Sequence, residues 1–218
     1  MKLHKIMALL LALLMVVPFA HAQEAAQASE APETAQTETA EEPAEEPAEE
    51  EVPNYFAMVK TVDLNNEPFD GSVFEGKRLM INIWADWCPP CRAEMPALNK
   101  LAEEYKDKIT IVGMIPEGVT VEEGKLVVVP EKLDLAKAVY EEMDITYPTI
   151  VPEEILYTLI SQTGLQVFPT TWFVDERGYL IHIAESSYDE AGWRSLMDNV
   201  LDFMDTQAEA RENPDAAQ

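Results

Sequence analysis

Cysteine and histidine are scarce in this chain, which has two cysteines and three histidines among its 218 residues. A structural zinc site takes four such ligands, and covalent haem attachment requires a histidine directly after the second cysteine of a Cys-x-x-Cys motif. Here Arg92 follows the second cysteine, and His182, in a predicted strand, is expected to be a surface or packing residue. The sequence therefore predicts no metal site and no cofactor.

Basic residues are also few, because 15 lysines and arginines stand against 41 aspartates and glutamates, which gives a formal net charge of −26. A protein that binds nucleic acid needs a basic surface to displace counterions from the phosphates. The charge balance therefore argues against a nucleic-acid partner.

The apolar run at the N-terminus, residues 6–17, is shorter than the roughly 20 residues that a membrane-spanning helix needs. It follows Lys2 and Lys5 and precedes Ala20-His21-Ala22, which is the order of an export signal. Residues 1–22 are therefore predicted to be a signal peptide. The protein is expected outside the cytoplasm, in a bacterial periplasm or secreted, with a membrane tether only if the signal stays uncleaved.

The segment after the signal, residues 23–52, contains eleven glutamates and no basic or aromatic residue. Like charges repel and prolines interrupt helices, so an acidic disordered linker is predicted, with an acidic docking tail as the alternative. Residues 53–205 are long enough to bury one hydrophobic core and are predicted to form a single domain. A polar, disordered tail is expected at residues 206–218.

Four segments are expected to form strands: residues 79–85, 109–115, 170–174 and 179–184. A helical pattern between the first two makes a parallel strand-helix-strand unit, and a turn joins the last two as an antiparallel hairpin. An apolar stripe from Trp193 to Met204 predicts a final helix that packs on the sheet.

Weaker patterns predict the remaining elements. Residues 56–61 and 67–74 favour an N-terminal hairpin, and residues 118–130 favour either an extra hairpin or a partner-facing flap. The rest of the central region is expected to contain a helix over residues 133–143, a strand at 147–151 and a helix at 153–161.

Cys88 and Cys91 form a Cys-Pro-Pro-Cys motif between the first buried strand and the helix after it. A bridge across so short a loop constrains the unfolded chain very little, so reversible thiol-disulfide exchange is the better interpretation. The N-terminus of a helix lowers the pKa of a thiol, and Pro89 and Pro90 suit the first helical positions. We expect Cys88 to be the attacking nucleophile and Cys91 the more buried resolving thiol, with the sulfurs accessible to solvent.

The string from Trp84 to Cys91, with Pro96 in the following helix and Phe168-Pro169 before a strand, resembles the thioredoxin superfamily and, within it, the TlpA/ResA-like group. The resemblance covers residues 55–205. It implies an α/β, thioredoxin-like three-layer fold, in which helices flank a central mixed sheet, with an N-terminal hairpin and a helix-bearing insert.

The resemblance also implies roles for particular residues. Phe168-Pro169 is expected to be a cis peptide beside the sulfurs, where the Phe168 backbone pairs with an extended substrate. Glu94 matches a glutamate that tunes the thiols or relays protons, with a solvated helix glutamate as the alternative. Asn82 occupies the place of a buried acid in cytoplasmic thioredoxins and cannot take a proton. The expected substrate-contacting residues are Trp87, Pro89, Pro90, Phe168 and Pro169.

An exported protein-disulfide oxidoreductase is the function that this resemblance implies, with reduction the favoured direction. Its expected partners are the thiols and disulfides of other extracytoplasmic proteins and a membrane thiol reductase as electron donor. A disulfide-forming oxidant and a non-catalytic thioredoxin-fold binding module remain the alternatives. Peroxiredoxin-type chemistry is disfavoured, because Ala85 stands where a threonine is expected by analogy.

Overall fold

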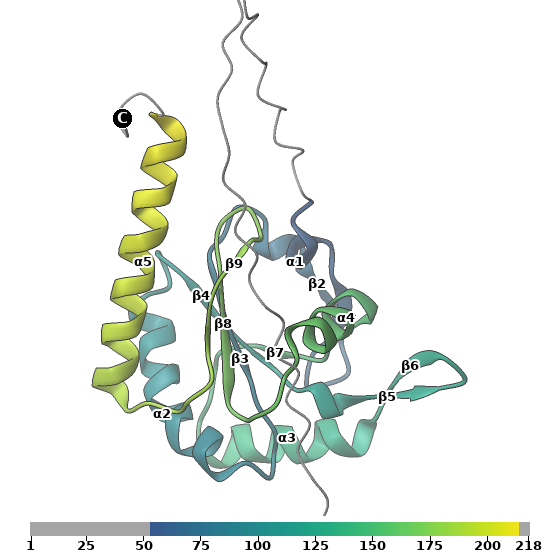
Figure 1. Cartoon of the computed structure of the whole chain (residues 1–218). Coiled ribbons are helices and arrows are strands. Elements are labelled where there is room, and N and C mark those ends of the chain that lie inside the picture. The colour runs from purple at the N-terminus through teal and green to yellow at the C-terminus, as the bar shows by residue number, and fades with distance from the viewer. Residues whose placement is uncertain (1–52, 214–218) are drawn as a thin grey trace, which may run out of the picture. The chain divides into compact units, whose positions relative to one another are not determined.

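A computed structural model describes residues 53–213, and the predicted signal peptide and linker lie outside these residues (Figure 1). Five strands form the central mixed sheet, β3 (Leu79–Ile83), β4 (Thr110–Met114), β7 (Thr149–Ile150), β8 (Thr170–Val174) and β9 (Leu180–Ala184). Their order is β7-β4-β3-β8-β9, with β3, β4 and β7 parallel, β8 antiparallel to β3, and β9 antiparallel to β8. The strands predicted at residues 79–85, 109–115, 147–151, 170–174 and 179–184 are all confirmed, although β7 is shorter than predicted.

Helices cover both faces of this sheet: α1 (Tyr55–Met58), α2 (Pro89–Glu104), α3 (Pro130–Glu142), α4 (Glu154–Thr163) and α5 (Glu190–Glu212). The apolar side chains of α2, α3 and α5 share one core cluster, and those of α1 and α4 share the other. Figure 1 shows α2 and α5 on one side of the sheet and α1 and α4 on the opposite side. Among the described helices, none combines the length and apolar character needed to cross a bilayer.

Strand β3 is buried on both faces of the sheet. The alternation of its side chains determines which of them face α2. Leu79, Ile81 and Ile83 belong to the core cluster that includes α4, whereas Met80 belongs to the cluster that includes α2. Since successive side chains of a strand point to opposite faces, Asn82 shares the α2 face with Met80. A fully buried amide is thereby placed beneath α2.

The predicted N-terminal hairpin is confirmed, but its strands are shorter than expected. β1 (Lys60–Val62) pairs antiparallel with β2 (Pro68–Asp70). Residues 56–58, predicted as strand, lie in α1 because the Asn54 side chain accepts a hydrogen bond from the Ala57 N–H at 3.2 Å. Residues 71–74 form the 3-10 helix η1 instead of extended strand, capped in the same way by Asp70.

The insert between β4 and β7 begins with the short 3-10 helix η2 (Pro116–Gly118) and continues as a two-stranded hairpin. β5 (Val119–Glu122) pairs antiparallel with β6 (Lys125–Val128), which confirms the hairpin reading of this segment. The hairpin projects away from the main sheet in Figure 1. The helix α3 follows it, so the insert bears a helix as predicted.

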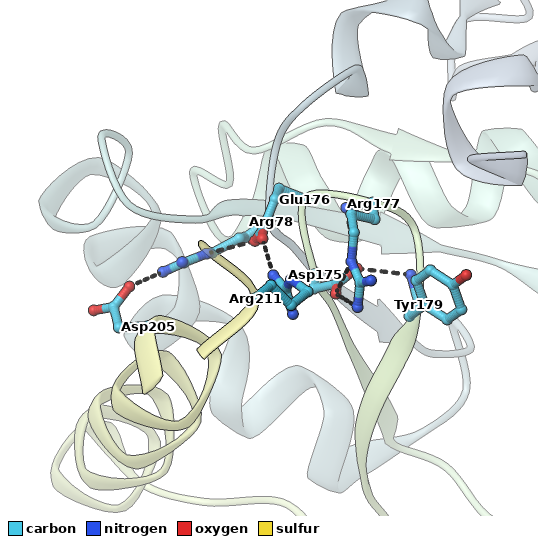
Figure 2. Close-up of polar contacts among 7 residues, drawn as sticks. All are labelled: Arg78, Asp175, Glu176, Arg177, Tyr179, Asp205 and Arg211. Carbon is cyan, nitrogen blue, oxygen red and sulfur yellow. Dashed lines mark hydrogen bonds and ion pairs between the residues drawn. The ribbon is translucent and has the colours of Figure 1, made fainter. Parts of the chain in front are cut away.

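The prediction of a disordered tail from residue 206 is wrong for residues 206–212, which continue α5. Figure 2 shows why the last turns are held in place. Arg78, immediately before β3, donates to Glu176 at 3.1 Å and to Asp205 at 2.6 Å, and Arg211 donates to Glu176 at 2.6 Å. These ion pairs attach the end of α5 to the sheet, an attachment that local composition does not reveal.

Candidate functional site

Two loops from distant parts of the sequence meet at one edge of the sheet. Ile83, the last residue of β3, pairs with Thr170, the first residue of the antiparallel strand β8. The loop that leaves β3 toward α2 and the loop that enters β8 therefore lie at the same edge. This register brings the Cys-Pro-Pro-Cys motif and the Phe168-Pro169 dipeptide to one site.

Cys88 and Cys91 are joined in a disulfide, with a sulfur–sulfur distance of 2.02 Å and 5.4 Å between their Cα atoms. Cys88 is the N-cap of α2, and its Sγ accepts a hydrogen bond from the Cys91 N–H at 3.3 Å. Pro89 and Pro90 occupy the first helical positions, as predicted, where no N–H is needed. A thiolate at Cys88 would receive this N–H and the positive end of the helix dipole.

The sulfurs are less open than expected, because Cys88 retains only 2% of its surface and Cys91 none. Both belong to the core cluster with Trp84 and Ala85, and Phe168 packs against that cluster. The expectation of openly accessible sulfurs is therefore wrong for this oxidised state. The remaining exposed surface belongs to Cys88, so Cys88 is the more accessible of the two cysteines.

Glu94 is buried, which excludes the alternative of a solvated surface glutamate. It lies three residues after Cys91 on α2, and therefore on the same face of the helix. Its carboxylate accepts hydrogen bonds from Asn82 Nδ2 at 2.9 Å and from Trp193 Nε1 at 3.2 Å. Asn82 Nδ2 also donates to Thr171 Oγ1 at 3.0 Å.

Burial raises the pKa of Glu94 from its ordinary value of 4.5 to about 7. The hydrogen bonds that Asn82 and Trp193 donate favour the carboxylate and oppose part of this rise. A carboxyl group with this pKa exchanges a proton readily at neutral pH. Glu94 is thus suited to take up or supply the proton of a neighbouring thiol.

Phe168-Pro169 is a cis peptide, as the resemblance implied. Pro169 is buried and Phe168 is half-buried, whereas Pro89 and Pro90 are exposed. The Trp87 ring meets the Phe168 ring edge to face, with 5.8 Å between the ring centroids. Trp87 and Phe168 therefore form one aromatic surface that joins the two loops of the site.

The sequence did not single out three residues that contact the site. Trp193 was predicted as ordinary core, yet its indole N–H reaches Glu94. Glu117 of η2 accepts a hydrogen bond from Trp87 Nε1 at 2.8 Å, and Lys132 of α3 donates to Glu117 at 3.0 Å and to Asp86 at 3.4 Å. These partners lie in the insert and in the last helix, so only the folded chain brings them to the motif.

Side chains that could ligate a metal are scattered in the described part of the chain. Within residues 53–213, no group of three or more histidine, cysteine, aspartate or glutamate side chains is arranged to hold a metal ion. His182 is exposed on β9, as predicted for a surface residue.

The mixed sheet, the disulfide at the start of α2 and the cis-proline loop opposite it define the thioredoxin-like class of proteins. The chain belongs to the Redoxin family, whose family model matches residues 29–201. The family resemblance drawn from the motifs is thereby confirmed.

Two relatives show how far the similarity extends. The thioredoxin-like protein YneN of Bacillus subtilis is 30% identical over 118 residues, which cover 53% of this chain and 62% of YneN. The thiol-disulfide oxidoreductase ResA of Oceanobacillus iheyensis is 33% identical over 117 residues, 53% of each chain. The matched part of this chain thus spans a little over half of either relative.

Solved structures confirm the fold. A thiol:disulfide interchange protein from Chlorobium tepidum superposes with a TM-score of 0.53 and 22% identity, covering 66% of this chain and 92% of that chain. A secreted disulfide oxidoreductase from Mycobacterium tuberculosis gives a TM-score of 0.50 at 15% identity, covering 68% and 97%. The thioredoxin-like fold expected from the sequence is therefore confirmed.

Proposed function

We propose that this protein is an exported thiol-disulfide oxidoreductase that reduces disulfides in other extracytoplasmic proteins. The single observation that carries the proposal is the Cys88–Cys91 disulfide at the N-terminus of α2, on the same helix as a buried carboxyl group with a pKa of about 7. A bridge that closes so short a loop adds little to stability, so exchange is its better use. The similarity to ResA, named as a thiol-disulfide oxidoreductase, supports the same activity.

The reaction begins with both cysteines reduced. The Cys88 thiolate attacks one sulfur of the client disulfide, so that a mixed disulfide forms and one client thiolate leaves. Cys91 gives its proton to the Glu94 carboxylate and attacks the Cys88 sulfur, which breaks the mixed disulfide and releases the second client thiolate. The first client thiolate takes up the proton that Cys88 lost to solvent, and the second takes the Cys91 proton from Glu94. Two electrons and two protons thus pass to the client, Glu94 is again a carboxylate, and Cys88–Cys91 is left oxidised.

Each residue of the site supports one part of this cycle. The Cys91 N–H at 3.3 Å stabilises negative charge on Cys88 Sγ. Asn82 and Trp193 fix the Glu94 carboxylate on the Cys91 side of α2. The Phe168 backbone, beside the buried Pro169, offers an extended client segment a partner for its main-chain groups.

Regeneration requires an external electron donor, for which we propose a membrane thiol reductase. The export signal predicted in residues 1–22 supports the extracytoplasmic location of this exchange. The reducing direction is the finer part of the proposal, because a dithiol of this type oxidises its clients if its reduction potential is high enough.

The test is an exchange assay with purified protein. The reduced form is expected to reduce a disulfide-bonded polypeptide, and the rate should fall to background in Cys88→Ser. A Ser161→Cys variant, which puts a lone exposed thiol on α4, controls for non-specific thiol reactivity in the Cys88→Ser background. If wild-type protein and Cys88→Ser behave alike, the chain is not an oxidoreductase and a binding function is left.

A further inference from the structure

A row of four buried residues crosses the central sheet on the face that α2 and α3 cover. In the strand register, Asn82 on β3 lies between Thr171 on β8 and Gly113 on β4. Gly113 pairs in turn with Thr149 on β7. Residues that pair across strands point to the same face of a sheet, so all four positions share the face of Asn82. Each of them is buried, and buried polar atoms are costly unless they form hydrogen bonds.

Both ends of this polar row have hydrogen-bond partners. Asn82 Nδ2 donates to Thr171 Oγ1 at 3.0 Å and to Glu94 at 2.9 Å. At the other end, the hydroxyl groups of Tyr140 and Thr149 form a hydrogen bond with each other. Within residues 53–213, three buried side-chain atoms find no hydrogen-bond partner in the chain: Asn82 Oδ1, Trp84 Nε1 and Tyr147 Oη. Their residues retain at most 4% of their surface.

Glycine at position 113 lets polar side chains approach β4 closely in the middle of the row. A Cβ at this position would lie 3.1 Å from Trp84 Nε1 and 2.9 Å from Tyr140 Oη, and it would collide with Thr149 Oγ1. Asn82 is the register partner of Gly113, and Trp84, two residues further along the chain, shares the face of Asn82. Two of the three unpaired atoms therefore belong to residues that border Gly113.

Tyr147 brings the third unpaired atom to the same place. Its ring packs edge to face against the Tyr140 ring, with 5.5 Å between the ring centroids. Burial in the first place, and then the neighbouring Tyr140 and Glu94, raise the pKa of Tyr147 well above its ordinary value. The Tyr147 hydroxyl thus keeps its proton and lies near both the middle of the row and the buried carboxyl group.

The chemical types of the three atoms select the ligand that would join them. The Trp84 indole N–H can only donate a hydrogen bond, the Tyr147 hydroxyl has a proton to donate, and Asn82 Oδ1 can only accept. A water molecule matches this set, because it accepts two hydrogen bonds and donates a third, and buried waters form about three. The indole N–H would oppose a cation, and the Asn82 oxygen would oppose an anion.

We propose that a single buried water binds beside Gly113 and joins the three unpaired atoms. It accepts hydrogen bonds from Trp84 and Tyr147 and donates one to Asn82 Oδ1. Because Oδ1 is then occupied, Asn82 Nδ2 stays turned toward the Glu94 carboxylate. Tyr147 is thus a positioning residue for Glu94, acting through the water and Asn82, and Trp84 is the second donor to the water.

The water determines which form of Glu94 the Asn82 amide favours. An amide that turned over would present Oδ1 to Glu94, and Oδ1 accepts a hydrogen bond only from the protonated carboxyl group. By holding Nδ2 in place, the water favours the carboxylate and keeps the pKa of Glu94 from rising further. Glu94 then remains ready to take the Cys91 proton. The inference rests on the proposed function for this last consequence only.

The titration of Glu94 can be followed without interference in the oxidised protein, where the cysteines of its own helix are bridged. Its titratable neighbours are Tyr147 and, from the loop before α5, Tyr188, whose backbone contacts it. β3 and α5 contribute Asn82 and Trp193, which do not titrate. Tyrosines titrate near pH 10 or above, so Glu94 is the group of this set that changes charge near pH 7.

A crystal structure of the oxidised full chain, at a resolution that shows ordered waters, tests the binding site. One water is expected within hydrogen-bonding distance of Asn82 Oδ1, Trp84 Nε1 and Tyr147 Oη. The proposal is overturned if no water is ordered there, or if the Tyr147 hydroxyl bonds Asn82 Oδ1 directly.

Tyr147→Phe tests the positioning role in solution. It removes one donor to the water and is expected to raise the pKa of Glu94 by about 0.5, measured from its carboxyl carbon shift by NMR across pH. Tyr105→Phe is the matched control, because it removes a hydroxyl from another buried tyrosine, which donates to Asp198 at 2.7 Å. It should leave the pKa of Glu94 unchanged. An unchanged pKa in Tyr147→Phe, or equal changes in both variants, would contradict the positioning role.

Neither measurement requires disulfide exchange, so both stand apart from the proposed function. If exchange occurs, the pH midpoint for the attack of Cys91 on a mixed disulfide at Cys88 should rise in Tyr147→Phe together with the pKa of Glu94. A midpoint that stays fixed while this pKa rises would contradict Glu94 as the proton acceptor in the proposed function, and would leave the water site supported.

Discussion

Glu94 is a carboxyl group that the fold removes from water and then surrounds with hydrogen-bond donors. Burial makes the carboxylate costly, so its pKa rises to about 7, and Asn82 and Trp193 limit that rise. The same burial that permits proton exchange at neutral pH must reduce the stability of the folded domain once Glu94 ionises. Function and stability are therefore linked at this residue.

The linkage predicts how stability depends on pH. The folded pKa of about 7 exceeds the unfolded value of 4.5, so the stabilising contribution is complete below pH 4.5 and is lost as pH rises through 7. The difference corresponds to about 3 kcal/mol. Relative to Glu94→Gln, wild type should lose about this free energy of unfolding between pH 4 and 8, measured by denaturant titration of the oxidised protein. Parallel curves for the two proteins would show that Glu94 does not titrate with a raised pKa.

The hydrogen bond from Asn82 to Glu94 leads to a second prediction, which concerns the pKa of the same carboxyl group. Its hydrogen bond at 2.9 Å favours the Glu94 carboxylate, so Asn82→Ala should raise the pKa of Glu94 above its value in wild type. Carboxyl carbon chemical shifts followed by NMR across pH would measure it. Thr171→Val, which removes only the other acceptor of Asn82, is the control and should change this pKa less. An unchanged or lower pKa in Asn82→Ala would contradict the assigned hydrogen bond.

At the scale of elements, the end of α5 depends on Arg78. The Arg78 side chain is only 18% exposed and contacts carboxylates from the β8–β9 turn and from α5. After allowance for partial solvent screening, Arg78→Met should lower the free energy of unfolding by about 1 kcal/mol and increase hydrogen exchange in the last turns of α5. Lys60→Met, which breaks the exposed Lys60–Asp70 pair, is the control and should leave α5 unchanged. Unaltered exchange in Arg78→Met would mean that α5 holds its last turns without this ion pair.

Elements with strong hydrophobic periodicity were predictable from sequence, and elements set by single side chains were not. β3 and β8 are apolar runs, and α2 follows directly from the motif. In contrast, α1 depends on one capping contact from Asn54. The last turns of α5 depend on ion pairs with residues that are distant in sequence, such as Arg78 and Glu176.

At the scale of the whole molecule, the reactive core of the site was predictable because its residues form two short motifs. Cys88, Cys91, Glu94 and Pro169 all lie in these motifs, and the buried position of Glu94 excluded the alternative of a solvated helix glutamate. The residues that hold Glu94 and Trp87 were not predictable as partners. Trp193 lies 99 positions from Glu94, and Glu117 lies 30 positions from Trp87, so the pairing exists only after the layers assemble.

The direction of electron flow depends on the reduction potential of the Cys88–Cys91 pair in the folded protein. The proposed reducing direction therefore predicts a low potential. A reductant of exported disulfides should equilibrate with glutathione at a potential well below the value of about −120 mV that is typical of strong periplasmic oxidants. Quantifying the oxidised and reduced forms across glutathione ratios measures it. Cys88→Ser, which cannot form the bridge, controls for mixed disulfides with glutathione. A value near −120 mV would favour the disulfide-forming alternative.

Trapping of the mixed disulfide tests most directly whether Cys88 exchanges disulfides with clients. Cys91→Ser removes the resolving thiol, so a polypeptide disulfide should accumulate as a covalent adduct through Cys88, located by mass spectrometry of non-reduced peptides. Cys88→Ser should accumulate no adduct, because the wholly buried Cys91 is not reached first. An adduct through Cys91 in Cys88→Ser, or none in either variant, would contradict the proposed exchange.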